Sequence, residues 1–416
     1  MIDAMYNVER EIPMKAVMYG GGNIGRGFIG TLFSASGYET VFIDVVDAVV
    51  NTLNREHKYP VRILSNEGHR DIEVTNVSAV DGKNADLVAD TIASADILAT
   101  AVGVNVLKFI VPNIAEGIRR RMNRNGGPLD IIICENLMDA NKVIEGMLKA
   151  LLSEEEQVWF DANIGLVEAS IGRMVPVQTE EMKDGNPMRV CVESYGYLPV
   201  DKAAFKGEIP AIKNMVPFEP FDFYIKRKLY VHNMGHATCA YLGDLQDLEY
   251  IYESIDRDET YAVVKLAMEE SALALSKHYG VPMESLSLHI NDLLYRFTNV
   301  ALKDTCKRVG GDPARKLSAH DRLIGSSTLV LKTGEIPAYI TIGAAAGLKR
   351  FVSEKELPQT VENAKALLLE VSGLEPDEIL VKLIMDMYAM LLAGVSIGQL
   401  RRAADKIKAA NRSNVI

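Results

Sequence analysis

The segment KLYVHNMGH, residues 228–236, combines an amine, an amide and an imidazole on a short apolar stretch. On an α-helix, Asn233 and His236 are three residues apart and share one face. Lys228 lies roughly 140° from Asn233 at about 100° per residue, with His236 between them. Such a trio could deprotonate a substrate hydroxyl and stabilise the alkoxide that develops. The alternative, a surface lysine, a helical asparagine and a core histidine, is equally compatible with the pattern.

An alcohol dehydrogenase without a metal needs a base, and Lys228 could fill that role. Its ordinary pKa near 10.4 would have to fall, through burial or through the positive nicotinamide of the oxidised cofactor. Asn233 could donate to the substrate oxygen together with Asn136, which ends an expected strand in the segment CENL. His236 could position the substrate. Asn136 could also be a simple helix N-cap, the commoner role of asparagine after a strand.

A glycine loop follows the first expected strand and opens a helix. Gly20, Gly22 and Gly25 have GxGxxG spacing, which lets backbone N–H groups approach a pyrophosphate at a helix N-terminus. The next expected strand ends in Asp44, at about the separation of a ribose-binding acid. A carboxylate there repels a 2′-phosphate and favours NAD over NADP. The alternative is a glycine-rich turn with a strand-capping aspartate, but the order of strand, loop, helix, strand and acid favours dinucleotide binding.

Further cofactor contacts are expected around the same strand ends. Within the loop we predict contacts from Asn23 and Ile24, and Arg26 could be either a surface charge or a clamp on the pyrophosphate. Val102 and Gly103 end a later strand, and ligands of open parallel sheets bind beyond the carboxyl ends of strands.

A basic cluster lies in the segment ARKLSAHDR, which contains Arg315, Lys316, His320 and Arg322. Arginine and lysine together could hold a substrate phosphate. The alternative is a loop whose charges pair with neighbouring aspartates, as most charge clusters do. We expect a substrate role for Arg315 and Lys316.

Composition excludes several classes of protein. The net charge of −11 over 416 residues argues against nucleic acid as a partner, which needs a basic surface. The four cysteines show no CxxC pair, which indicates neither a disulfide framework nor a zinc site and suits a reducing cytoplasm. The chain starts without a signal peptide and contains no long uncharged apolar run, so we expect a cytoplasmic protein with no membrane partner.

The pattern of apolar runs predicts an α/β Rossmann-type doubly wound sheet domain over 14–212, followed by a mainly α-helical domain over 213–416 and preceded by an extension over 1–13. Strands are expected at 15–21, 39–45, 95–103, 129–136 and 158–165. Residues 59–64 and 71–80 are expected to form a small β insertion, and 188–201 to continue the sheet. Long helices are expected at 218–244, 255–280, 284–298, 360–372 and 376–394.

These motifs resemble the polyol-specific long-chain dehydrogenases, and among them the mannitol-1-phosphate 5-dehydrogenases. The likeness runs from about residue 14 to 350 and is carried by KLYVHNMGH and by GGGNIGRGFIG, CENL, FKG at 205–207, GHATCAYLG, AMEES and RVGGDPARKLSAHDRLI. It implies an NAD-binding domain, a helical substrate domain and a metal-independent reaction. It also implies Lys228 as general base, Asn136 and Asn233 as the oxyanion pair, and His236 as substrate binder.

The sequence departs from the family pattern at Gly172, at Tyr195 and Tyr197, and at His232. These departures concern the identity of the substrate. The expected reaction interconverts mannitol 1-phosphate and fructose 6-phosphate with NAD. Two alternatives stay open: reduction of an unphosphorylated hexulose or a keto sugar acid of the tagaturonate or fructuronate type, and a non-catalytic NAD-binding regulatory protein. We expect a small-molecule sugar phosphate or polyol as partner and a monomer or small homo-oligomer.

Overall fold

The computed structural model describes residues 14–413, which divide into two compact units. A sheet unit ends at Leu64 and resumes over His69–Phe221, and a helical unit holds Ser65–Gly68 and the chain from Asp222 onward. The division at Phe221 lies a few residues beyond the expected boundary at 212. The expected extension over 1–13 lies outside the described residues.

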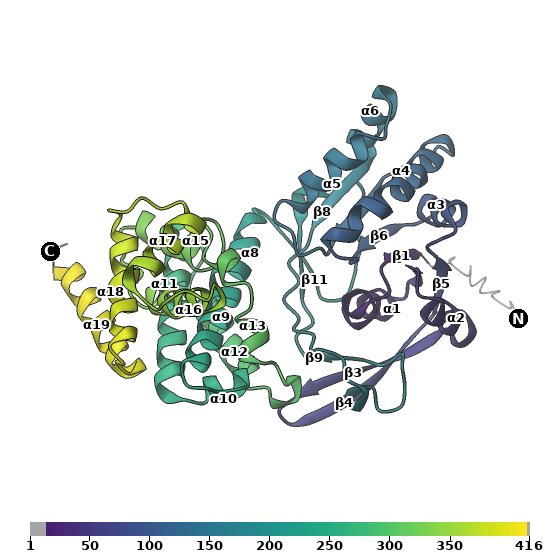
Figure 1. Cartoon of the computed structure of the whole chain (residues 1–416). Coiled ribbons are helices and arrows are strands. Elements are labelled where there is room, and N and C mark those ends of the chain that lie inside the picture. Colours follow the sequence, from purple (N-terminus) through teal and green to yellow (C-terminus); the bar gives the residue numbers. More distant parts are fainter. Residues whose placement is uncertain (1–13, 414–416) are drawn as a thin grey trace, which may run out of the picture. The chain divides into compact units, whose positions relative to one another are not determined.

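The centre of the sheet unit is a six-stranded parallel sheet with the order β5-β2-β1-β6-β7-β8 (Figure 1). The strand order changes direction between β1 and β6, which is where open α/β sheets bind ligands. The predicted α/β fold is therefore confirmed. Its strands are β1 (Lys15–Tyr19), β2 (Glu39–Asp44), β5 (Val77–Asp81), β6 (Ile97–Thr100), β7 (Leu129–Ile133) and β8 (Ile164–Glu168).

Three predictions about strands were wrong. The segment 77–80, assigned to a β insertion, is β5 and pairs with β2 in the main sheet. The segment 188–201 does not continue that sheet: β9 pairs with β3, and β10 pairs with β11 in a separate parallel pair. Alternating apolar residues identify a strand but not its neighbour, which explains these errors. The strands concerned are β3 (Lys58–Ser65), β4 (Gly68–Thr75), β9 (Val190–Glu193), β10 (Leu198–Asp201) and β11 (Met215–Phe218).

The third error is the strand expected at 158–165, most of which is helix α6 (Glu154–Asn163). Ser153 and Glu156 form a capping box, and the first turn carries three glutamates. Such a terminus starts a helix strongly, because it satisfies unpaired N–H groups and complements the helix dipole. The strand β8 begins only at Ile164.

The alternation of side chains along β1 separates two cores. Val17 and Tyr19 face a cluster formed with α3, α4, α5 and α6, whereas Ala16 and Met18 face one formed with η1, α1, α2 and the small sheets. The helical segments of this unit are η1 (Gly25–Ile29), α1 (Gly30–Ala35), α2 (Asp47–Glu56), α3 (Ala85–Ala93), η2 (Val104–Val106), α4 (Leu107–Asn123), α5 (Ala140–Lys149), α6, α7 (Glu180–Lys183) and η3 (Lys202–Ala204).

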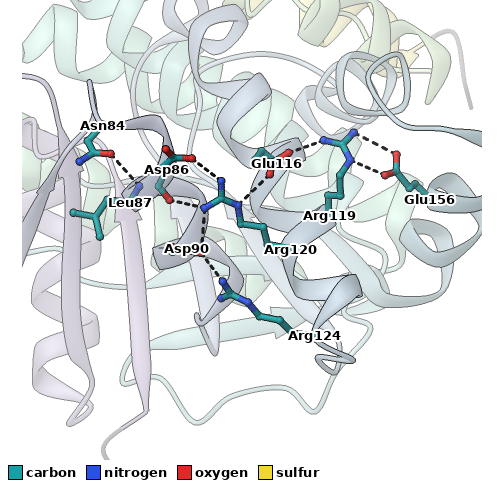
Figure 2. A network of polar contacts seen from close by, with 9 residues as sticks. All are labelled: Asn84, Asp86, Leu87, Asp90, Glu116, Arg119, Arg120, Arg124 and Glu156. Atoms are coloured by element: carbon teal, nitrogen blue, oxygen red, sulfur yellow. Dashed lines mark hydrogen bonds and ion pairs between the residues drawn. The ribbon is translucent and has the colours of Figure 1, made fainter.

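An ion-pair network covers α3, α4 and α6 at the surface of this unit (Figure 2). Arg120 contacts Asp86 at 2.8 Å and Glu116 at 3.0 Å, and Arg119 contacts Glu156 at 2.6 Å. Exposed pairs of this kind contribute about 0.2–1 kcal/mol each. The network therefore fixes the register of the helices more than it stabilises the fold, which depends on the apolar cores beneath.

The helical unit is built around α9, which packs against α11, α16, α10 and α13. Its approach to α16 depends on Gly343, where a Cβ would lie 2.3 Å from Thr238 Oγ1. The long helix expected at 218–244 begins at Asp222 and continues without a break through α8, η4 and α9 to Asp244, with a π-helical stretch in its middle. The helices are α8 (Asp222–Lys226), η4 (Arg227–Asn233), α9 (Met234–Asp244), α10 (Ile251–Ile255), α11 (Asp258–Tyr279), α12 (Met283–Phe297), η5 (Val300–Leu302), α13 (Cys306–Val309), α14 (Pro313–Lys316), α15 (Ile324–Lys332), α16 (Ile340–Glu354), α17 (Val361–Ser372), α18 (Ile379–Leu392) and α19 (Ile397–Ser413).

Candidate active site

The glycine loop between β1 and η1 has the geometry of a phosphate cradle. Gly20 has φ 105°, and a Cβ there would lie 2.5 Å from the carbonyl oxygen of Ala101. A Cβ on Gly25 would lie 1.9 Å from the carbonyl oxygen of Gly20, so the turn closes only with glycine at both positions. Gly22 is exposed with nothing within 4 Å of its Cβ position, which leaves space above the loop for a pyrophosphate.

Asp44 ends β2 beside this loop, as expected of a ribose-binding acid. Its Oδ2 accepts a hydrogen bond from Gly21 N at 2.7 Å, and its Oδ1 accepts one from Val46 N at 2.9 Å. Each carboxylate oxygen has a further lone pair. The side chain can thus hold the loop and still accept from ribose hydroxyls. The loop and its acid fit a dinucleotide.

Arg26 is buried, which rules out a surface charge. Its Nε donates to the carbonyl oxygen of Gly21 at 2.6 Å, and its Nη1 donates to that of Met188 at 2.6 Å. Burial lowers the pKa of the guanidinium. Arg26 therefore ties the glycine loop to the segment before β9. Asn23 is exposed and Ile24 half-buried at the start of the helical stretch, and their contact with a cofactor stays a prediction.

The ends of β6 and β7 are joined by a carboxylate that the sequence reasoning missed. Glu135 accepts hydrogen bonds from Val102 N at 3.0 Å and from Gly103 N at 2.8 Å. Gly103 has φ 90°, a conformation that favours glycine. Asn136 follows and is exposed. Glu135 could have been predicted from the sequence, because it lies at the carboxyl end of an expected strand, directly before Asn136.

Lys228 and Asn233 belong to a π-helical segment, Arg227–Asn233, inserted between α8 and α9. A π-helix joins residues i and i+5. The spacing of five between Lys228 and Asn233 thus corresponds to one turn, and the roughly 140° expected on an α-helix no longer applies. Both side chains are half-buried. Both residues were predicted from the sequence, but the π-helical geometry that relates them was not.

His236 lies on the first turns of α9 and is held on two sides. Its ring stacks on Phe297 with centroids 4.7 Å apart, and its Nε2 lies 3.6 Å from Oδ2 of Asp304. Asp304 also accepts from Arg308 Nε at 2.8 Å. Burial lowers the pKa of His236 to about 4, against the effect of Asp304. The imidazole is therefore neutral at pH 7. No pattern in the sequence pointed to Asp304.

Basic side chains surround the two histidines of this segment. Burial lowers the pKa of His232 well below its ordinary value, and Arg296, His236, His289 and Lys228 lower it further. The rings of His232 and His236 have centroids 6.2 Å apart. The helical unit thus concentrates cationic groups around its predicted catalytic segment, although the whole chain is acidic.

Arg315 and Lys316, expected to act together, have different surroundings. Arg315 is half-exposed, and Asp312 and Asp321 contact its guanidinium at 2.7 and 3.1 Å. Lys316 is buried, and burial followed by the charges of Arg322 and Arg315 lowers its pKa to about 8. Two carboxylates already neutralise Arg315, so Lys316 is the stronger candidate for binding a substrate anion.

Arg322 connects this cluster to His236, because its charge contributes to lowering the pKa values of both Lys316 and His236. Arg322 is thus the one basic residue whose charge acts on both the Lys316 amine and the His236 ring among the described groups.

Both parts of the chain match one protein family. The Mannitol dehydrogenase Rossmann domain matches residues 14–214, and the Mannitol dehydrogenase C-terminal domain matches residues 221–371. The chain belongs to the mannitol dehydrogenase family. As a member of that family it is a polyol oxidoreductase, and the fit of the loop and Asp44 to a dinucleotide agrees with NAD as its cofactor.

Two solved structures share this fold over almost the whole chain. Pseudomonas fluorescens mannitol 2-dehydrogenase, in a ternary complex with NAD and D-mannitol, has 15% identity and a TM-score of 0.72, with 95% of this chain and 94% of that chain covered. A D-sorbitol dehydrogenase in substrate-free form has 14% identity and a TM-score of 0.77, with 91% and 93% covered. At these identities the likeness shows the fold.

The departures from the family pattern are located in both units of this mannitol dehydrogenase family member. A Cβ on Gly172 would lie 3.0 Å from the ring of Tyr195, so the glycine leaves space for that ring. The neighbouring Arg173 donates to the carbonyl oxygen of Gly27 at 2.9 Å. Tyr195 and Tyr197 pack edge to face, and His232 is buried in the helical unit.

A cavity of about 1020 Å³ lies in the helical unit, lined mainly by α11, α19 and the segment between α15 and α16. Its lining does not include the predicted catalytic residues. Within residues 14–413, none of the helices is both long and apolar enough to span a membrane. The same residues contain no group of three or more histidine, cysteine, aspartate or glutamate side chains that could hold a metal ion.

Proposed function

We propose that the protein is an NAD-dependent dehydrogenase that interconverts mannitol 1-phosphate and fructose 6-phosphate. The observation that carries the proposal is the π-helical segment Arg227–Asn233, which places Lys228 and Asn233 one turn apart at the start of α9. Single π-helical turns occur frequently at functional sites. An amine and an amide one turn apart match the base and the oxyanion donor that an alcohol oxidation requires.

Lys228, in its neutral form, accepts the proton of the substrate hydroxyl. An oxidised nicotinamide cofactor held by the glycine loop and Asp44 would supply the hydride acceptor for the carbon that carries this hydroxyl. Asn233 donates its amide N–H to the oxygen as negative charge develops there. Asn136 is proposed as a second amide donor to that oxygen, a role taken from the family resemblance.

His236 positions the substrate as a neutral imidazole. A proton on Nε2, which faces Asp304 at 3.6 Å, leaves Nδ1 as a hydrogen-bond acceptor for a neighbouring substrate hydroxyl. The stacking on Phe297 and the ion pair between Asp304 and Arg308 fix the orientation of the ring. The lowered pKa keeps the ring neutral over the physiological range.

The cationic groups of the helical unit favour an anionic substrate. Lys316 is buried beside Arg322, and no ion pair or side-chain hydrogen bond satisfies its amine within the part of the chain that the structure describes. A phosphate would supply the missing negative charge and hydrogen-bond acceptors. The carboxylate of a keto sugar acid would do the same in part, whereas an unphosphorylated hexulose would not.

The test is NADH oxidation with fructose 6-phosphate, run beside fructose, tagaturonate and fructuronate, each repeated with NADPH. We expect turnover with fructose 6-phosphate and NADH and at least tenfold lower kcat/KM with the other pairs. Turnover on a uronate alone would mean that the substrate is a keto sugar acid, with Lys228 still the proposed base. Cofactor binding without turnover on any ketose or polyol would contradict the proposal and indicate a regulatory NAD-binding protein.

A further inference from the structure

The carboxylate of Glu135 is buried at the carboxyl edge of the main sheet, immediately after β7. Its side chain accepts from two successive backbone groups, Val102 N at 3.0 Å and Gly103 N at 2.8 Å. These N–H groups belong to the segment that follows β6. Glu135 thus fixes the positions of two adjacent strand ends, and it uses N–H groups that would otherwise be free to bind a ligand.

A second carboxylate makes the same arrangement at the opposite end of the same strand. Asp130, near the start of β7, accepts from Lys206 N at 2.8 Å and Gly207 N at 3.2 Å and is 5% exposed, compared with 8% for Glu135. Ligands of parallel sheets bind at the carboxyl edge, so Asp130 lies at the edge that does not bind them. Asp130 shows what such a carboxylate does when its role is structural alone.

Glu135 lies at the strand ends that remain for the nicotinamide half of a dinucleotide. Asp44 ends β2 and lies on one side of the switch point between β1 and β6. If Asp44 binds the adenosine ribose, the strand ends of β6 and β7 are left for the nicotinamide half of the cofactor. Among the described residues, no basic side chain forms an ion pair with Glu135, so only the two backbone N–H groups compensate its negative charge.

We propose that Glu135 is a positioning residue whose charge also makes the chain bind the oxidised cofactor in preference to the reduced one. It holds Val102 and Gly103 in place beneath the nicotinamide half, and its charge favours the oxidised, positively charged nicotinamide over the neutral reduced ring. The proposal rests on the proposed NAD-dependent function. The chain would thereby bind oxidised NAD more tightly, relative to NADH, than a neutral side chain at this position allows.

The experiment compares Glu135→Gln with the matched control Asp130→Asn. Dissociation constants for oxidised NAD and for NADH are measured by calorimetry on the full chain without substrate, together with the thermal unfolding midpoint. Glu135→Gln is expected to weaken oxidised NAD about tenfold and NADH no more than about twofold. Asp130→Asn is expected to lower the unfolding midpoint and leave the ratio of the two constants unchanged.

Equal weakening of both cofactors by Glu135→Gln, or an equal change of their ratio by Asp130→Asn, would overturn the proposal. If Glu135→Gln does not fold, Glu135→Asp decides, because it keeps the charge: the ratio is expected to stay within about twofold of wild type, and a larger shift would contradict the proposal. Binding is measured without turnover, so a chain that binds both cofactors but oxidises no polyol would overturn the proposed function and still test Glu135. A chain that binds neither would overturn both.

Discussion

Lys228 and Asn233 are five residues apart within a π-helical segment, and this spacing makes them neighbours across one helical turn. In a regular α-helix the same two side chains would point roughly 140° apart. The segment is followed by α9, which is buried in the centre of the helical unit. The surrounding helices can therefore hold the π-helical turn against the tendency of the backbone to return to α-helix.

Asn233→Asp tests the role of the amide as a donor. The variant keeps the shape of the side chain but replaces the N–H donor with a carboxylate oxygen. We expect kcat to fall about 10²–10³-fold, as when a single oxyanion donor is removed. Cofactor affinity, measured by NADH fluorescence, should stay within about twofold of wild type. Unchanged kcat would exclude Asn233 from the reaction.

Lys316→Met and Arg315→Met form a matched pair on α14. Within residues 14–413, no ion pair or side-chain hydrogen bond holds the buried Lys316 amine, whereas two aspartates pair with Arg315. We expect Lys316→Met to raise KM for fructose 6-phosphate at least tenfold with less effect on kcat, and Arg315→Met to change KM less than about threefold. The opposite order would mean that Arg315 leaves its aspartates to bind substrate.

We expect the folded protein to lose stability in acid because His236 is buried in its neutral form. Its pKa is about 4 in the folded state, below the ordinary value of 6.5, so the folded chain binds fewer protons than the unfolded chain between these values. The contribution of neutral His236 to the free energy of unfolding is present above pH 6.5 and is lost as the pH falls toward 4. His236→Gln should reduce the slope of the unfolding midpoint between pH 6.5 and 5. An unchanged slope would contradict the burial of a neutral imidazole.

For Glu270 we expect the opposite pH dependence, a contribution to stability that decreases as the pH rises. Burial raises its pKa to about 7, against the effect of Lys408, whose Nζ lies 3.5 Å from Oε1. Between pH 4.5 and 7 the folded state binds more protons, so this contribution to stability is lost as the pH rises through 7. Glu270→Gln keeps an acceptor for the N–H groups of Tyr339 and Ile340. Its unfolding midpoint should therefore rise relative to wild type from pH 5 to pH 8. A difference that stays constant would show that the carboxyl does not titrate in this range.

The sequence predicted most of the parallel sheet because each of its strands is a short apolar run bounded by turns. Long helices were also predictable, and those expected at 255–280, 284–298, 360–372 and 376–394 are confirmed as α11, α12, α17 and α18. The pairing of strands was not predictable. β9 is buried along its whole length, as β6 and β7 of the main sheet are, yet it pairs with β3, because pairing depends on tertiary contacts.

The site shows the same limit. Glycine spacing and a terminal acid were sufficient to locate Gly20, Gly25 and Asp44 around one loop, since these contacts are local to two consecutive strands. Asp304 could not be found, because it lies in the loop between η5 and α13 and reaches His236 on α9 only through tertiary packing. The π-helical turn was also hidden, because its residues have an ordinary helical composition.

The central claim is that Lys228 is the base, and Lys228→Ala tests it most directly. Turnover of fructose 6-phosphate is measured beside NADH affinity and the unfolding midpoint of the same preparation. We predict that kcat falls about 10²–10⁴-fold, the range for removal of a general acid or base, with NADH affinity within about twofold of wild type. A folded Lys228→Ala variant that binds NADH and turns over at close to the wild-type rate would contradict the account.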